Sequence, residues 1–80
     1  MGDSLYRTSD LYYAAYLKVA GVKLVSTDRV GDRVFFLFED QAPGILRDLK
    51  NQFFMDQAKV PALSYSQAVK ALKALVYADR

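Results

Sequence analysis

The chain opens with a short strand-like run at residues 5–8, followed by an apolar helix. Ser9 or Asp10 is suited to cap this helix, because a short polar side chain satisfies the free amides at a helix start. We expect the helix to run to Ala20, with Gly21 in the left-handed conformation that commonly ends a helix. A single lysine is its only charged residue. A helix that is apolar on nearly all sides is either buried on several sides or meets a partner.

Residues 22–29 and 33–39 predict a β-hairpin, with a Gly31–Asp32 turn that has glycine at its first central position. On the face expected to join the core, this register pairs Arg29 with Val34, Thr27 with Phe36 and Val25 with Phe38. On the other face it pairs Asp28 with Phe35, Ser26 with Leu37 and Leu24 with Glu39. The second strand is apolar on both faces, so we expect it inside the sheet and not at an edge.

Two further helices are predicted in the second half of the chain. Asp40 is expected to cap the first, with Pro43 in its opening turn and an apolar stripe of Ile45, Leu46, Leu49 and Phe53. After a loop containing Pro61, the capping-box pattern Ser64-x-x-Gln67 is expected to start the last helix. This helix is expected to bury Ala68, Val69, Leu72, Leu75 and Val76. The predicted fold is a single α+β domain over residues 1–80, of order β-α-β-β-α-α, with helices packed on a three-stranded sheet that contains the hairpin.

Several segments of the chain are similar to a family of small bacterial and phage proteins that is catalogued as a domain of unknown function. These segments are YRTSDL at residues 6–11, AAYL at 14–17, Gly21, FLFED at 36–40, Val60 and LKALVY at 72–77. The resemblance covers nearly the whole chain and implies a compact α+β domain from a bacterium or phage. It implies no activity and transfers no functional residues.

The composition indicates a folded domain with a small margin of stability. The 80 residues are 52% hydrophobic and 14% aromatic, which excludes a disordered chain. A chain of this length buries only about 60% of its unfolded surface. It also lacks cysteine and histidine, which would supply disulfides or zinc ligands. We therefore expect a homodimer, because a partner adds buried surface.

The sequence also favours a cytoplasmic location. Its first residues include neither the basic nor the apolar segment of a signal peptide. No apolar run approaches the roughly 20 residues that a membrane span requires. The absence of cysteine fits the reducing cytoplasm.

Few residues suit catalysis. Without histidine or cysteine, the usual proton shuttle and the strongest nucleophile are both missing. The carboxylates fall where caps and turns need them, as at Asp10, Asp32 and Asp40. Glu39 and Asp40 are adjacent, so in a strand they would point to opposite faces and could not form a dyad. We expect no enzymatic activity, no cofactor and no metal site.

A protein–protein interface is the first of two binding functions that the sequence suggests. Tyrosine combines a large contact area with a polar tip, which is why interfaces favour it. The candidate interface residues are Tyr12, Tyr13, Tyr16, Phe35 and Leu37. The alternative for the tyrosines is a half-buried position in the core with the hydroxyl in water. We rank an interaction or accessory module, homo-oligomeric or partner-binding, as the first hypothesis.

Nucleic-acid binding is the second hypothesis. The net charge is +2, and residues 41–80 carry six bases and three acids against five bases and six acids in residues 1–40. Cations beside an aromatic ring can bind a phosphate and stack a base. The candidate contacts are Lys59, Lys70, Lys73, Tyr77 and Arg80. A solvated helix face is the alternative explanation for these residues.

Overall fold

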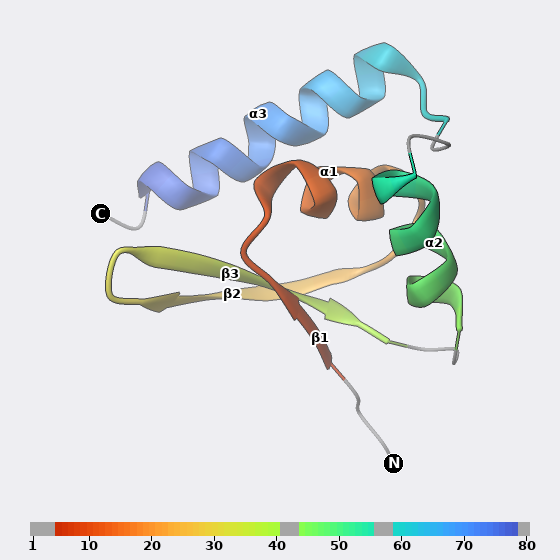
Figure 1. Cartoon of the computed structure of the whole chain (residues 1–80). Helices are drawn as coiled ribbons and strands as arrows, with labels where there is room; N and C mark the ends of the chain where they lie inside the picture. The colour runs from red at the N-terminus through yellow and green to blue at the C-terminus, as the bar shows by residue number, and fades with distance from the viewer. Residues whose placement is uncertain (1–4, 41–43, 56–58, 79–80) are drawn as a thin grey trace.

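The computed structural model describes residues 5–40, 44–55 and 59–78 (Figure 1). Within these ranges the elements are β1 (Leu5–Thr8), α1 (Leu11–Val19), β2 (Leu24–Val30), β3 (Arg33–Glu39), α2 (Ile45–Phe54) and α3 (Ala62–Ala78). The predicted α+β class and the order β-α-β-β-α-α are therefore confirmed. None of the helices in these ranges is both long enough and apolar enough to cross a membrane.

The described strands form an antiparallel sheet of order β1-β3-β2, so the doubly apolar strand β3 is central, as predicted. Phe36 and Phe38 on β3 are buried, with 1% and 0% of their surface exposed. The hairpin register matches the prediction from Ser26 to Arg29, with Arg29 opposite Val34. Gly31 in the turn has a φ of 61°, a left-handed value that glycine adopts without steric cost.

A β-bulge in β2 contradicts the predicted register beyond Ser26. Leu24 lies opposite Phe38, where Val25 was expected, and not opposite Glu39. The shifted register continues past the bulge, because the Glu39 amide donates to the Lys23 carbonyl at 2.9 Å. The one extra residue in β2 reverses the faces of the sheet on which Leu24 and Val25 were expected to lie. Leu24 consequently packs against the core, whereas Val25 is 47% exposed.

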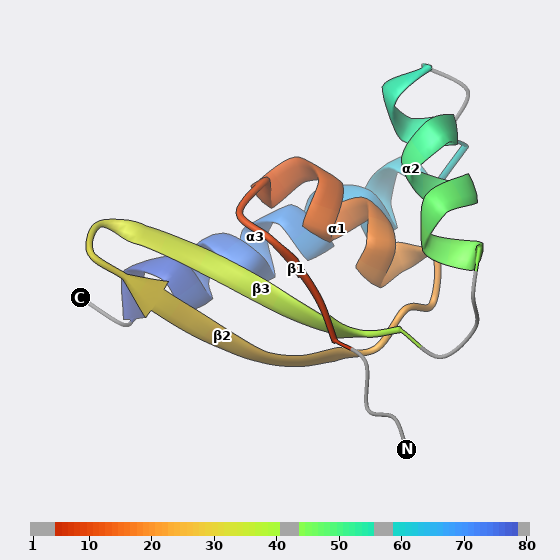
Figure 2. The ribbon, with the colours of Figure 1, turned by 60° about the horizontal axis from the view of Figure 1, so that its bottom comes forward.

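Helix α1 is buried on several sides, which accounts for its apolar character. Both α2 and α3 pack against it, and the helices lie on one side of the sheet (Figures 1 and 2). Ala14 and Ala15 have no exposed surface, and their small side chains let neighbouring elements approach the α1 backbone closely. The Asp10 side chain caps the helix by accepting from the Tyr12 and Tyr13 amides, each at 3.1 Å. Of the two predicted caps, Asp10 is therefore the one used.

The starts of α2 and α3 differ from the prediction. Helix α2 begins after Gly44, which occupies the N-cap position with a φ of 92°, so Asp40 is not its cap. Pro43 lies outside the described residues. Helix α3 begins at Ala62, which places Ser64 within the helix and not at its cap. The Pro61 carbonyl accepts the first helical hydrogen bond from the Tyr65 amide at 2.9 Å. The fixed φ of proline also suits the start of a helix.

The buried sides of α2 and α3 are narrower than expected. Ala68 and Leu72 of α3 are buried and Leu46 anchors α2 in the core. In contrast, Leu75 is 43% exposed and Ile45 is 52% exposed, although both were expected to face the core. The two helices therefore each present a narrow apolar stripe to α1 and the sheet.

Replacing Phe36 with Ala should lower the free energy of unfolding by about 3–5 kcal/mol, because it empties a fully packed site in the core. That loss is comparable to the whole stability of many small domains. The matched control is Leu63→Ala, at a position that is 71% exposed, where little change is expected. Thermal and urea unfolding of both variants measure the difference. An unchanged midpoint for Phe36→Ala would show that the core lies elsewhere.

Candidate functional site

The side of the sheet away from α1, α2 and α3 is covered by none of the described helices (Figure 2). We call this side the open face. Alternation along the strands and the observed register place on it Leu5, Arg7, Ser26, Asp28, Val30, Arg33, Phe35, Leu37 and Glu39. Phe35 and Leu37 are half-buried, and Leu5 is 50% exposed. The predicted second face thus exists, although Leu24 belongs to the core side.

Arg7 stacks on Phe35 across the open face. Its guanidinium carbon lies 3.8 Å from the centre of the Phe35 ring. Arg7 pairs with Leu37 in the β1–β3 ladder, so its side chain reaches diagonally to the next residue on the same face. A cation over an aromatic ring is stabilising, and the long arginine stem also covers apolar surface. Arg7 therefore shields part of the aromatic surface that β3 presents on this side.

The open face carries charges of both signs. Arg7 and Arg33 contribute positive charges from β1 and β3, whereas Asp28 and Glu39 contribute negative charges from β2 and β3. A sheet surface that binds single-stranded RNA combines exposed aromatic rings with positive charge. Phe35 is instead half-buried under Arg7, and the nearby acids would repel phosphates. The charges and the half-buried ring of this face are therefore better suited to contact another protein than a nucleic acid.

Two of the three candidate interface tyrosines lie in the core instead. Tyr13 and Tyr16 are 1% and 3% exposed, and their ring centres lie 5.4 and 5.5 Å from that of Phe53 in α2. The Tyr16 hydroxyl donates to Gln52 Oε1 at 3.2 Å. Because α1 is enclosed by its neighbours, these rings are not available to a partner. Tyr12 is 52% exposed and is the one of the three that reaches the surface.

The buried hydroxyl of Tyr13 resists ionisation. It donates to the Leu46 carbonyl at 3.4 Å. Burial is the main cause that raises the pKa of Tyr13 well above its ordinary value of 10.0, and the neighbouring Tyr6 and Tyr16 raise it further. Burial also raises the pKa of Tyr65, with smaller contributions from Asp10 and Tyr12. Because the pKa of Tyr13 is raised in the folded state, the free energy of unfolding keeps its full value below the unfolded pKa of 10.0 and falls as pH rises above it.

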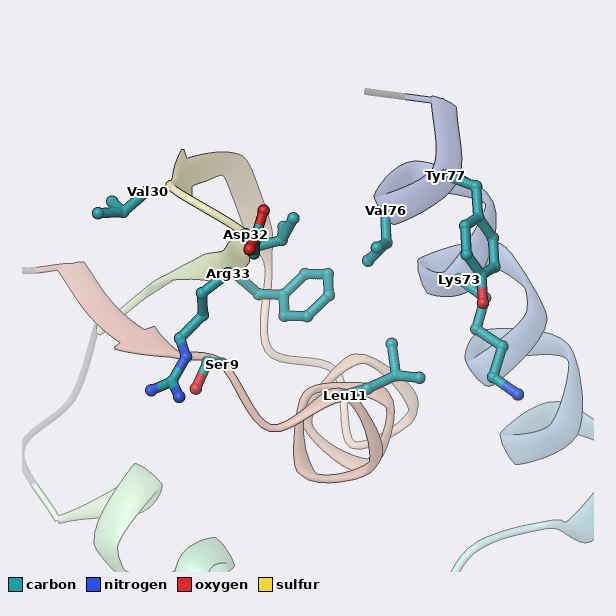
Figure 3. Close-up of a pocket in the computed structure, with 10 residues that line it drawn as sticks. Ser9, Leu11, Val30, Asp32, Arg33, Lys73, Val76 and Tyr77 are labelled. Carbon is teal, nitrogen blue, oxygen red and sulfur yellow. The ribbon is translucent and has the colours of Figure 1, made fainter. Parts of the chain in front are cut away.

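The candidate nucleic-acid contacts are only partly brought together. Lys70, Lys73 and Tyr77 are all exposed on α3. Lys59 precedes the helix, whose start at Ala62 already lies about three turns from Lys73 at 3.6 residues per turn. Arg80 lies outside the described residues. Lys73 and Tyr77 are one turn apart and lie side by side at the edge of a groove (Figure 3).

Two contacts of arginine were not foreseen from the sequence. One is the stacking of Arg7 on Phe35, and the other is a hydrogen bond from Arg29 to the Val76 carbonyl at 2.9 Å. Val76 is in the last turns of α3, where carbonyls lack helical partners and carry partial negative charge. Arg29 lies 47 positions away in sequence, so no local pattern signals this contact.

In the described part of the chain, no three histidine, cysteine, aspartate or glutamate side chains gather in a way that could hold a metal ion. What these ranges contain is a helix-backed antiparallel sheet with one open face of mixed charge. The fold and site thus define a small α+β domain with a surface suited to binding.

The chain belongs to a family described as a domain of unknown function, DUF5659, which it matches over residues 3–78. No curated protein and no solved structure matches it significantly. The bacterial or phage origin stays a prediction.

Replacing Tyr13 with Phe should make stability less sensitive to alkaline pH. Above about pH 10 the unfolded state begins to release the tyrosine proton while the folded state retains it, so the free energy of unfolding falls as pH rises. Phenylalanine keeps the ring and removes this ionisation. At neutral pH the loss of a long hydrogen bond should cost about 1 kcal/mol or less.

Urea unfolding from neutral to strongly alkaline pH measures this effect. The decline of stability should be shallower in Tyr13→Phe than in the unsubstituted protein. Tyr65→Phe serves as the comparison, because Tyr65 is less buried and its removal should flatten the curve less. Parallel curves for Tyr13→Phe and the unsubstituted protein would argue against a buried, protonated Tyr13.

Proposed function

We propose that the protein is a non-enzymatic interaction module that forms a homodimer through the open face of its sheet. The observation that carries this proposal is the presence of Leu5, Phe35 and Leu37 on a face that no described helix covers. Antiparallel sheets often leave one face in water, but that face is then predominantly polar. The central strand here is apolar on both sides. An apolar surface with a polar surround is typical of an interaction site.

Charge complementarity favours a second copy of the chain as the partner. A two-fold axis brings the same surface of each subunit together, so residue i of one contacts residue j of the other and the reverse. Arg7 on one subunit would then be placed to meet Asp28 or Glu39 on its partner. Because each face carries both signs, every such contact would form twice.

The size of the open face indicates a weak dimer. Strands about 4.8 Å apart with a rise of about 3.4 Å per residue give the sheet dimensions of roughly 24 by 14 Å. Stable complexes commonly bury about 800 Å² on each partner, and this face is smaller than that. We therefore expect a dimer that dissociates on dilution. For a domain of 80 residues even modest added burial is useful.

Leu37→Glu should abolish dimerisation, because two like charges would be buried opposite each other at the two-fold axis. Leu5→Glu tests the same face at a more exposed position, in case Leu37→Glu lowers stability. The matched control is Leu63→Glu, which makes the same change on α3, away from the sheet. Sedimentation over a range of protein concentrations should show twice the 9.0 kDa monomer mass for the unsubstituted protein and for the control.

Three outcomes would count against this dimer. The first is a monomer for the unsubstituted protein at every concentration. The second is loss of the dimer in Leu63→Glu with retention in Leu37→Glu and Leu5→Glu, which would move the interface to the helical side. The third is a dimer that persists in all of these variants. Circular dichroism should show that each variant retains its helices.

Nucleic-acid binding by the outer side of α3 is the alternative function. Lys70, Lys73 and Tyr77 support it, because they place cations and an aromatic ring on one exposed helix. The separation of Lys59 from Lys73 and the small net charge of +2 weigh against it. If this alternative holds, Lys70→Glu combined with Lys73→Glu should abolish binding to single-stranded DNA and RNA, and binding should fall steeply with salt. Fluorescence anisotropy with mixed-sequence oligonucleotides measures it, and no binding at low salt would rule the alternative out.

A further inference from the structure

The central strand β3 carries opposite charges at its two ends on the open face. Arg33 begins the strand and Glu39 ends it, and the register places both on the side of the sheet that also carries Phe35 and Leu37. The Arg33 side chain is exposed and extends toward Ser9, away from α3 (Figure 3). At a rise of about 3.4 Å per residue the two charged residues lie roughly 20 Å apart, so they cannot pair with each other within one chain.

The order of side chains along this face of β3 is suited to a reversed copy of the same strand. Phe35 and Leu37 lie between the two charged residues, and both are half-buried. The row therefore reads as a cation, two apolar residues and an anion. Reversing the direction of the strand exchanges the signs at its ends and keeps the apolar centre. A second copy that lies antiparallel over the first thus meets opposite charge at each end and an apolar residue at each central position.

Two identical sheets that pack face to face, with their strands nearly aligned, can be related by a two-fold axis along the strands or across them. An axis along β3 places each residue of β3 over its own copy, so Arg33 meets Arg33 and Glu39 meets Glu39. Like charges brought together across an interface strongly oppose association. An axis across the strands, midway between Phe35 and Leu37, instead places Arg33 over Glu39 of the partner and Phe35 over Leu37 of the partner.

The outer strand β2 favours the axis across the strands as well. Val30, at one end of β2, is 53% exposed. Val25, near the other end, is 47% exposed where the bulge turns it away from the core. The axis across the strands places the Val30 end of β2 over the Val25 end of the partner's β2. Each exposed valine then gains an apolar neighbour in the other subunit.

We propose that two copies of the open face meet in this antiparallel arrangement, with Arg33 of each subunit paired with Glu39 of the other. The inference rests on the dimer proposed above and specifies how its subunits are oriented. A carboxylate accepts from more than one donor, so Glu39 can bind this arginine in addition to its contacts within its own chain. The two ion pairs lie at the ends of an apolar centre, as is common at interfaces, where the rim is polar. Such pairs select one orientation over another.

Reversing either charge should weaken the dimer. Arg33→Glu and Glu39→Arg should each raise the dissociation constant about tenfold or more, because each variant places two like-charge pairs where the unsubstituted dimer has two opposite-charge pairs. An equimolar mixture of the two variants should recover the affinity of the unsubstituted protein, because a subunit with two acids then meets a subunit with two arginines. Sedimentation at low salt measures these affinities, since salt screens exposed pairs.

The matched control is Lys70→Glu, which reverses an exposed charge on α3, away from the open face. It should dimerise as the unsubstituted protein does. Glu39 is half-buried, so Glu39→Gln serves as a milder change at that position, with a smaller loss of affinity expected. Circular dichroism and thermal midpoints should show that all of these variants are folded.

Cross-linking distinguishes the two orientations directly, because the chain contains no cysteine of its own. Packed sheets lie about 10 Å apart, a distance that a short bismaleimide spans. A mixture of Arg33→Cys and Glu39→Cys should give a link between positions 33 and 39 of different subunits, which mass spectrometry identifies. Each of these variants alone should give little linked product. An axis along the strands would instead link Arg33→Cys to its own copy.

A dimer that depends on Leu37 but is unchanged by both charge reversals would overturn this arrangement and leave the dimer itself intact. Linkage of Arg33→Cys to its own copy would do the same. Loss of the dimer in each reversal without recovery in the mixture, or an equal loss in Lys70→Glu, would also overturn it. A monomer for the unsubstituted protein at every concentration would overturn the dimer and the arrangement together, so the two failures are separable.

Discussion

The close packing around α1 is the constraint on which the rest of the structure depends. Ala14 and Ala15 have no exposed surface, and Tyr13, Tyr16 and Leu17 are buried with them. Helices α2 and α3 make their main packing contacts with this helix. Larger side chains at the two alanines would force neighbouring elements apart, which a densely packed core tolerates poorly. A chain that has no disulfide or zinc ligands obtains its single core by surrounding one short helix.

The same arrangement leaves two different surfaces for binding. With the helices on one side of the sheet, the other side stays open and presents alternate residues of a doubly apolar strand. On the helical side, β1 is short and α3 is long, so the hairpin end and the helix end stand apart and border a groove. One surface mixes charges of both signs, and the other places Lys73 beside the exposed ring of Tyr77.

Local sequence signals predicted the elements well and their junctions less well. The apolar character of β3 on both faces placed it correctly in the centre, and Asp10 and Gly21 correctly bounded α1. The bulge was not predictable, because Leu24 and Val25 are both apolar and either could face the core. The start of α3 was misplaced because a capping-box pattern at Ser64 competes with the geometry of Pro61.

For the candidate site, the prediction identified the second sheet face but misjudged which tyrosines were accessible. Tyr13 and Tyr16 are covered by α2, and no periodicity within α1 reveals which side a later helix will cover. The contacts of Arg7 with Phe35 and Arg29 with Val76 depend on strand pairing and tertiary packing. The groove likewise arises only when three segments that are distant in sequence come together.

The bulge at Val25 also has a consequence for the solubility of the folded chain. The run VFFLF in β3 has the high β-propensity and low charge of segments that form amyloid-like stacks. In the fold it has a strand on each side, and the outer strand β2 is irregular near one end while β1 extends over only four residues. Irregular and short edges are poor templates for adding a strand from another molecule. The strands on either side of VFFLF thus cover it with sheet edges that do not readily pair with a strand of another molecule.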